Sequence, residues 1–229
     1  MSEISLTAII PVRGGSRRLP NKNILPFGDS NLLVHKIRQL KQVDGINTIV
    51  VSSDSDVMLE MANQEAGGGG AAVMIHKRPL EYCDECSKSF NDVVEHIASS
   101  VDGDVIMWAP CVCPLTSIES YENAIKDFYK YVIEKKEFDS VISAKMFKEY
   151  LFDENKPLNF SPEHHVPSQK LPQWKTIVNG FYIAPREKMI QWRYLYGQNP
   201  YLHILNKREA VDIDDQEDFE VAKALLRGV

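Results

Sequence analysis

Short apolar segments alternate along the chain with segments of helical period. Six runs rich in β-branched and other apolar residues predict strands at Leu6 to Ile10, Thr48 to Ser52, Ala71 to Ile75, Val105 to Trp108, Val141 to Ala144 and Val178 to Ala184. These runs are nearly continuous in hydrophobicity, which favours a sheet covered by helices on both faces. We therefore predict an α/β fold with a doubly wound, mostly parallel sheet.

The segments between these runs carry apolar residues at helical spacing. Thr116 and Glu119 predict a capping box at the start of a helix whose apolar face holds Tyr121, Ile125, Phe128 and Val132. Asp215 predicts the N-cap of the last helix, whose apolar face holds Phe219, Ala222, Leu225 and Leu226. A third helix is predicted on Phe90, Val93, Val94 and Ile97.

Two stretches interrupt the alternation. The four-glycine run 67–70 precedes a strand without a following helix start or GK[ST] sequence, so we interpret it as a loop rather than a phosphate cradle. Residues 148–175 contain four prolines, a His164-His165 pair and little periodicity. This stretch predicts an excursion from the sheet.

Length and charge restrict the class of protein. A chain of 229 residues suits one domain, 1–229, with 148–175 as a sub-lobe. A net charge of −6 argues against a nucleic-acid partner and confines any anion site to a local basic cluster. The N-terminal residues lack a signal pattern and no apolar run reaches membrane-spanning length, so we expect a cytoplasmic protein without a membrane partner.

The four cysteines form a CxxC pair, Cys83 and Cys86, and a CxC pair, Cys111 and Cys113. Together they could supply a four-thiolate zinc site in an interaction module. Neither pair of cysteines lies in a sequence typical of a zinc-ribbon knuckle, and cysteines of an intracellular chain are usually reduced thiols. We assign no metal ligand to them.

The loop after the first predicted strand, residues 11–23, combines two glycines with four basic residues, Arg13, Arg17, Arg18 and Lys22. Glycines let backbone N–H groups approach an anion, and basic side chains neutralise phosphate at the edge of an open α/β sheet. The loop is neither a Walker A sequence nor GxGxxG, so alone it leaves open a solvated basic loop.

Near the C-terminus, Asp212 and Asp214 are two residues apart just before the last predicted helix. On an extended strand end their carboxylates would point the same way and could share one Mg²⁺, completed by substrate phosphates. Asp215 would act as the N-cap only. The alternative is that the acidic run does nothing but cap the helix.

These segments resemble, over nearly the whole chain, the family of CMP-sialic acid synthetases and, more distantly, CMP-Kdo synthetases. The family's basic loop ending in Lys-Asn is matched by 13–23, its Ser-Asp strand end by 51–54, and its Arg-Pro and serine-rich helix start by Arg78-Pro79 and 87–89. Its Leu-Pro-Gln, Asn-Gly…Tyr-Ile and Asp-Ile-Asp segments are matched by 171–173, 178–183 and 212–214.

The resemblance implies a Rossmann-like fold and a homodimer in which 148–175 protrudes to complete the partner's sugar site. It implies Mg²⁺-dependent transfer of CMP from CTP to a sugar acid: the anomeric hydroxyl attacks the α-phosphorus in line and pyrophosphate leaves. Catalysis is expected from Arg13, Lys22 and Asp214, with Asp212 and Asp214 as metal ligands. Nucleotide contacts are expected from Arg13, Gly14, Gly15, Ser16, Arg17, Lys22, Asn23 and Arg78, and substrate contacts from Ser89, Lys170, Gln173, Asn179 and Tyr182.

The chain departs from the family pattern in two places. Family members carry Gln-Pro-Thr-Ser-Pro-Leu-Arg after the fourth strand, where residues 109–116 here read Ala-Pro-Cys-Val-Cys-Pro-Leu-Thr. The family's carboxylate-binding arginine falls near Ser168 and Gln169, where Lys170 offers a point charge but no bidentate fork. The sequence therefore leaves the acceptor open among sialic, legionaminic, pseudaminic or other acids and a phosphonate or phosphorylated alcohol. A non-catalytic nucleotide-binding protein of the same fold is a further alternative.

Overall fold

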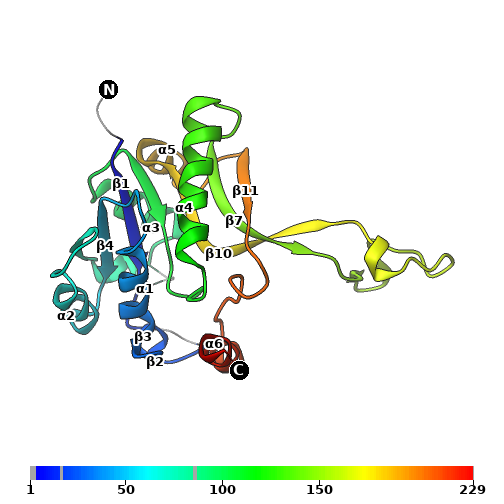
Figure 1. Cartoon of the computed structure of the whole chain (residues 1–229), viewed down its shortest axis with the longest axis horizontal. Helices are drawn as coiled ribbons and strands as arrows, with labels where there is room; N and C mark the ends of the chain where they lie inside the picture. The colour runs from blue at the N-terminus through cyan, green and yellow to red at the C-terminus, as the bar shows by residue number, and fades with distance from the viewer. Residues whose placement is uncertain (1–3, 16–17, 85–86, 229) are drawn as a thin grey trace.

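The computed structural model of the chain describes residues 4–15, 18–84 and 87–228. Its centre is a seven-stranded sheet with the order β11-β7-β10-β6-β1-β4-β5 (Figure 1). β10 runs antiparallel to both of its neighbours, and the other pairings in this sheet are parallel. The mostly parallel sheet predicted from the sequence is thus confirmed.

The strands of this sheet are β1 (Leu6–Pro11), β4 (Thr48–Ser53), β5 (Ala72–Lys77), β6 (Val105–Trp108), β7 (Ser140–Phe147), β10 (Trp174–Pro185) and β11 (Pro200–Ile204). Two small hairpins add β2 (Pro26–Phe27) with β3 (Ser30–Asn31) and β8 (Phe152–Asp153) with β9 (Lys156–Pro157). The α-helices are α1 (Leu32–Leu40), α2 (Asp56–Gln64), α3 (Phe90–Ser99), α4 (Ile118–Asp127), α5 (Arg186–Trp192) and α6 (Gln216–Arg227). None of the helices in the described ranges is both long and apolar enough to cross a bilayer.

Alternation along each strand divides the core into two layers. Leu6, Ala8 and Ile10 of β1 face the layer that contains the apolar residues of α1, α4 and α6. Ile9, between them, faces the layer formed with α3 and α5. Since successive strand residues point to opposite faces, a continuous apolar run is what a sheet covered on both sides requires.

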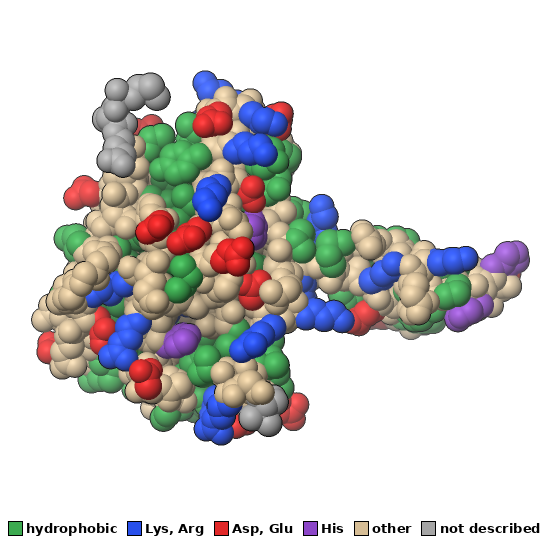
Figure 2. Space-filling view, viewed as in Figure 1, with side chains coloured by type: hydrophobic (Ala, Val, Ile, Leu, Met, Phe, Trp, Pro, Cys, Tyr) green, Lys and Arg blue, Asp and Glu red, His purple; other side chains and the backbone are tan. Residues whose placement is uncertain are grey.

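Residues 148–173 leave the body as an arm (Figure 1). The outer ends of β7 and β10 extend into it as a pair, with Trp174 opposite Phe147, and the hairpin β8-β9 lies beyond. In the space-filling view the arm stands clear of the body (Figure 2). A role for it in dimerisation stays a prediction.

The structure corrects several local expectations. The N-cap of α4 is Ser117, whose side chain accepts from the Ser120 N–H, while Thr116 is buried and its hydroxyl donates to the Cys113 carbonyl. The capping box predicted on Thr116 and Glu119 is therefore wrong. The predicted cap Asp215 is right, and it forms a capping box with Asp218.

The acidic segment also differs from its prediction. Residues 211–214 form an irregular segment outside any strand, between a turn and α6. It is held in place because the fully buried Ile213 donates its N–H to the Val112 carbonyl at 2.9 Å.

Candidate active site

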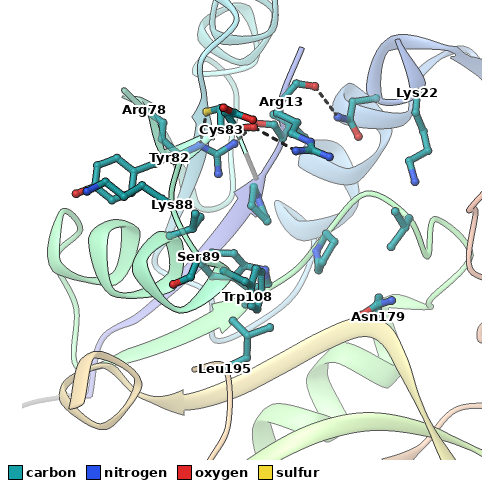
Figure 3. Close-up of a pocket in the computed structure, with 18 of the residues that line it drawn as sticks. Arg13, Lys22, Arg78, Tyr82, Cys83, Lys88, Ser89, Trp108, Asn179 and Leu195 are labelled. Atoms are coloured by element: carbon teal, nitrogen blue, oxygen red, sulfur yellow. Dashed lines mark hydrogen bonds between the residues drawn. The ribbon is translucent and has the colours of Figure 1, made fainter. Parts of the chain in front are cut away.

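A cavity of about 820 Å³ opens where β1 and β6 end, beside the first turn of α3 and the middle of β10. Its wall is lined by Pro11, Val12, Arg13, Arg18, Lys22, Asn23, Arg78, Tyr82, Cys83, Asp84, Lys88, Ser89, Phe90, Val93, Trp108, Pro110, Val112, Asn179, Tyr182 and Leu195. The carboxyl edge of an open α/β sheet is where such folds bind ligands. In Figure 3, Arg78 and Cys83 lie at one end, Leu195 at the other and Trp108 between them.

The basic loop places three cationic side chains on this wall: Arg13, Arg18 and Lys22. The Lys22 ammonium donates to the Ile213 carbonyl at 2.7 Å. Burial lowers the pKa of Lys22, and the carboxylates of Asp214 and Asp212 oppose that shift. The loop therefore brings positive charge beside the acidic segment.

Arg78 forms part of the cavity wall rather than a mobile arm. It is only 5% exposed, and its guanidinium donates to the Val12 carbonyl at 2.6 Å and to the Cys83 sulfur at 2.9 Å. The Cys83 carbonyl in turn accepts from Arg13 at 3.1 Å. These contacts tie the loop after β5 to the loop after β1 (Figure 3).

A bulge in β10 directs Asn179 toward the acidic segment. The register between β10 and β7 shifts between Ile177 and Tyr182. The Ser143 hydroxyl fills the gap, donating to the Val178 carbonyl at 2.6 Å and accepting from the Phe181 N–H at 3.0 Å. A bulge re-aims side chains next to it, and Asn179 follows Val178 on the bulged strand.

Asn179 links the cavity to Asp212. Its amide nitrogen donates to Asp212 Oδ2 at 2.8 Å, and its amide oxygen accepts from the Tyr182 hydroxyl at 2.7 Å. Burial raises the pKa of Asp212, while the hydrogen bond from Asn179 opposes the rise and the carboxylate of Asp214 adds to it. Burial also raises the pKa of Tyr182, so its hydroxyl remains a donor.

The acidic pair fits the predicted magnesium ion. Asp212 Oδ1 is buried and meets no hydrogen-bond partner among the described residues, which leaves a lone pair for a cation. Asp214 is exposed and pairs with Arg18 at 2.9 Å. Mg²⁺ commonly takes one or two protein carboxylates and completes its shell with water and substrate phosphates. That the pair binds magnesium stays a prediction.

The structure brings many of the predicted site residues together and leaves others apart. Arg13, Lys22, Asn23, Arg78, Ser89, Asn179 and Tyr182 line the cavity. Asp212 joins them through Asn179, and Asp214 through Arg18. Ser16 and Arg17 lie outside the described residues.

Several predicted residues have other surroundings. The Gly14 N–H, expected to face an anion, donates to Asp54 Oδ1 at 3.0 Å, and Gly15 is exposed. The Ser89 hydroxyl donates to Asp92 within the capping box of α3. Lys170 and Gln173 lie on the arm and do not line the cavity of their own chain. A contact between these two residues and substrate stays a prediction.

Sequence reasoning missed part of the wall. Arg18 was identifiable as one of the loop's basic residues, but its direction depends on the loop's path. Tyr82, Lys88 and Phe90 come from the connection after β5 and the start of α3, and Trp108 ends β6. These residues carry no motif, and only the packing of their elements places them at the cavity.

The described cysteines do not form a metal centre. Cys111 and Cys113 are buried, and burial raises the pKa of the Cys111 thiol to about 12. Cys83 contacts Arg78, and Cys86 lies outside the described residues. Within the described ranges no three His, Cys, Asp or Glu side chains gather closely enough to hold an ion.

Comparison with known proteins agrees with this geometry. A family model described as cytidylyltransferase matches residues 7–169. A pseudaminic acid cytidylyltransferase of Campylobacter jejuni is 25% identical over 96% of this chain and 95% of its own. An N-acylneuraminate cytidylyltransferase of Escherichia coli is 24% identical over 95% of this chain, which spans 51% of that longer protein.

A solved structure of CMP:2-keto-3-deoxy-manno-octonic acid synthetase complexed with CTP shares the fold. Its TM-score is 0.67 at 15% identity, with 98% of this chain and 99% of that chain covered. The Rossmann-like fold expected from the resemblance is thereby confirmed. Because the family model covers well over half of the chain and the relatives align along nearly all of it, the chain belongs to the cytidylyltransferase family and is a nucleotidyltransferase.

Proposed function

We propose that the protein transfers CMP from CTP to the anomeric hydroxyl of a sugar acid, with release of pyrophosphate. The observation that carries the proposal is the contact between the basic loop, which lines the cavity, and the acidic segment beside it: Lys22 donates to the carbonyl of Ile213, the residue between Asp212 and Asp214. Phosphoryl transfer needs cationic groups on the phosphates and carboxylates that can hold a metal ion nearby.

The residues of this chain act mainly by binding and orienting. Arg13, Arg18 and Lys22 provide positive charge for a triphosphate at the ends of β1 and β6. The buried Arg78 stiffens the wall where the nucleoside is expected. Asp212 and Asp214 would hold Mg²⁺, which supplies charge stabilisation to phosphate oxygens when bound.

The acceptor is proposed to be a nonulosonic acid, because relatives that align over nearly the whole chain act on pseudaminic acid in one case and N-acylneuraminate in another. The loop at 109–116 is where the chain departs from the family pattern on the acceptor side. Pro110 and Val112 of this loop line the cavity, whereas Cys111 and Cys113 point into the core. The acceptor side of the wall is therefore largely apolar there, and a phosphonate acceptor belongs in any test.

We propose a homodimer in which the arm of one chain contacts the other. The arm exposes apolar side chains, with Phe152 62% and Leu158 52% exposed. Exposed apolar groups gathered on a projecting segment are typical of an interface. The arm also carries Lys170 and Gln173, which do not line the cavity described above.

The deciding experiment incubates the protein with CTP, Mg²⁺ and single acceptors, and measures pyrophosphate release and the mass of the product. The panel holds N-acylneuraminic, legionaminic and pseudaminic acids, Kdo, a phosphonate and a phosphorylated alcohol. Turnover with a sugar acid and formation of its CMP ester is the expected result. Turnover with the phosphorus-containing acceptors alone would show that the acceptor is a phosphonate or phosphorylated alcohol and not a sugar acid. No turnover with any acceptor would contradict the proposal.

Nucleotide choice is tested separately by thermal shift. At equal concentrations, CTP should raise the melting temperature more than ATP, GTP or UTP, because the ligand that binds the folded state more tightly stabilises it more. Equal shifts with all four nucleotides would indicate a triphosphate site without base selection.

A further inference from the structure

Helix α1 carries a lysine whose ammonium group is completely buried. Lys36 is 0% exposed and does not line the cavity. Its Nζ donates to the Tyr121 hydroxyl at 2.6 Å, to Gln39 Oε1 at 2.8 Å and to the Cys113 carbonyl at 3.0 Å. These bonds use all three donors of an ammonium group, and none of the three acceptors is a carboxylate.

Burying the Lys36 ammonium lowers the stability of the fold unless all three hydrogen bonds are kept. A buried charge without a counter-charge is tolerated only when its hydrogen-bonding groups are satisfied. The position of each acceptor relative to α1 is therefore narrowly defined. Of the three, the Cys113 carbonyl belongs to the backbone of the loop that joins β6 to α4.

Other residues of α1 hold the same loop. Gln39 Nε2 donates to the carbonyls of Pro114, at 3.2 Å, and Thr116. His35 Nε2 lies 3.0 Å from the Pro114 carbonyl. The loop is thus held to α1 through the carbonyls of Cys113, Pro114 and Thr116. On its other part, Pro110 and Val112 line the cavity.

The loop in turn fastens the acidic segment. The Val112 carbonyl accepts from the Ile213 N–H at 2.9 Å, and Ile213 lies between Asp212 and Asp214. Ile213 is fully buried, so its position fixes that of its two neighbours. A continuous series of hydrogen bonds and two short backbone steps therefore connects the Lys36 ammonium to the two aspartates.

We propose that Lys36 is a positioning residue for the transfer reaction: it fixes the 109–116 loop and, through Val112 and Ile213, the placement of Asp212 and Asp214. It touches neither substrate nor metal. The consequence for catalysis rests on the proposed function, whereas the effect on the acidic segment does not. This loop is where the chain departs from the pattern of the family, and Lys36 is one of the side chains that give it its shape.

The test uses the full chain and the variant Lys36→Met, which keeps the length of the side chain but removes its donors. The control is Leu40→Ala on the same helix, because Leu40 is fully buried and its loss weakens packing without removing any of the bonds to the loop. Hydrogen exchange of the Ile213 amide is followed by mass spectrometry at temperatures where both variants are equally folded. Steady-state kinetics gives kcat and the KM for CTP and for the acceptor.

In Lys36→Met we expect the Ile213 amide to exchange at least about tenfold faster than in Leu40→Ala. We also expect kcat to fall about 10- to 100-fold with a higher KM for the acceptor, since small misplacements of reacting groups cost rate on this scale. The KM for CTP should rise less than the KM for the acceptor, because Lys22 of the basic loop donates to Ile213, whereas Arg13 is held by the Cys83 carbonyl.

Exchange and kinetics equal to those of Leu40→Ala would show a general packing role and overturn the proposal. If wild-type protein turns over no acceptor, the proposed function fails, and the exchange of Ile213 still decides whether Lys36 positions the segment. If Lys36→Met does not fold, Tyr121→Phe replaces it, since it removes one acceptor only. That variant should speed Ile213 exchange, and exchange at the wild-type rate would contradict the proposal.

Discussion

Asp212 and Asp214 share a segment but differ in their surroundings. Asp212 is half-buried, with Oδ2 bonded to Asn179 and Oδ1 without a partner in the described part of the chain. Asp214 is exposed and pairs with Arg18. Asp215, by contrast, faces α6 and accepts from the N–H groups of Glu217 and Asp218. The N-cap role of Asp215 was predicted from the sequence and is confirmed, whereas the strand predicted for Asp212 and Asp214 is absent: both lie in an irregular segment.

We predict that Asp212→Asn and Asp214→Asn each lower turnover by orders of magnitude, because each removes one negative charge from the proposed metal site. Asp215→Asn should retain nearly normal turnover, since asparagine and aspartate cap helices about equally well. Pyrophosphate release at saturating CTP measures all three. An inactive Asp215→Asn beside active variants at 212 and 214 would show that the metal site is wrongly assigned.

Lys36 also predicts a pH dependence of stability. Burial lowers its pKa in the folded protein to about 8 from 10.5, with Cys111 and Cys113 nearby opposing the shift. Between these pH values the unfolded chain binds a proton that the folded chain does not, so the free energy of unfolding rises with pH, by at most about 1.4 kcal/mol per pH unit. Below pH 8 the lysine is charged in both the folded and the unfolded chain, so its contribution to the free energy of unfolding does not change with pH.

Urea unfolding of wild type and Lys36→Met at pH 7, 8, 9 and 10 measures this effect. The buried Cys111, Cys113 and Tyr121 have raised pKa values, which give both proteins the opposite trend at high pH. The difference between the proteins isolates the lysine and should grow in favour of wild type above pH 8. Parallel pH profiles would mean that Lys36 remains charged when buried.

Local sequence could not identify Lys36. A lysine inside an amphipathic helix is ordinarily solvated, and its partners are 3, 77 and 85 residues away. The contact of Arg18 with Asp214 could not be predicted either. The loop contains several basic residues, and the path of its backbone determines which of them reaches Asp214. Motif residues such as Lys22, Asn179 and Asp212 were found because the order of motifs along the chain is itself informative.

At the scale of elements, apolar runs located six of the seven strands of the main sheet. β11 was missed because Pro-Tyr-Leu-His-Ile is short, begins with proline and alternates with polar residues, as suits an edge strand. The antiparallel direction of β10 is set by the chain's return from the arm, which hydrophobicity does not encode. The bulge was equally hidden, although Gly180 within a strand is a signal of one.

Gly180 provides a test of the bulge. A Cβ at this position would lie 3.1 Å from Ser143 Oγ and 3.2 Å from Leu205 Cδ1, so these neighbours must shift. We expect Gly180→Ala to cost about 1–3 kcal/mol of unfolding free energy and to lower turnover, because Asn179 is adjacent and contacts Asp212. Gly67→Ala, where nothing lies within 4 Å, is the matched control and should be nearly neutral. Equal stability and turnover in the two variants would show that the bulge tolerates a side chain.

At the scale of the whole molecule, the body and the arm divide the predicted site. Lys22, Asn179 and Asp212 belong to the body, whereas Lys170 and Gln173 belong to the arm. The arm is ordered by its own contacts, including a 2.6 Å hydrogen bond from the Tyr150 hydroxyl to the Val166 carbonyl. Contacts within the arm therefore define its shape in the single chain.

This division predicts complementation between two inactive variants. In the first, residues 148–173 are replaced by a short glycine-serine turn joining Phe147 to Trp174, which already pair across β7 and β10. It should bind CTP, judged by thermal shift, but be monomeric by light scattering and turn over the acceptor poorly. The second, Asp212→Asn, keeps its arm and lacks the acidic side chain. Mixed together, they should regain turnover, because the arm of the second chain can complete the intact cavity of the first.

Two outcomes would contradict this prediction. Full activity of the armless monomer would show that the reaction does not need the arm. Failure of a mixed dimer, once formed, to recover activity would show that the arm does not act on its partner.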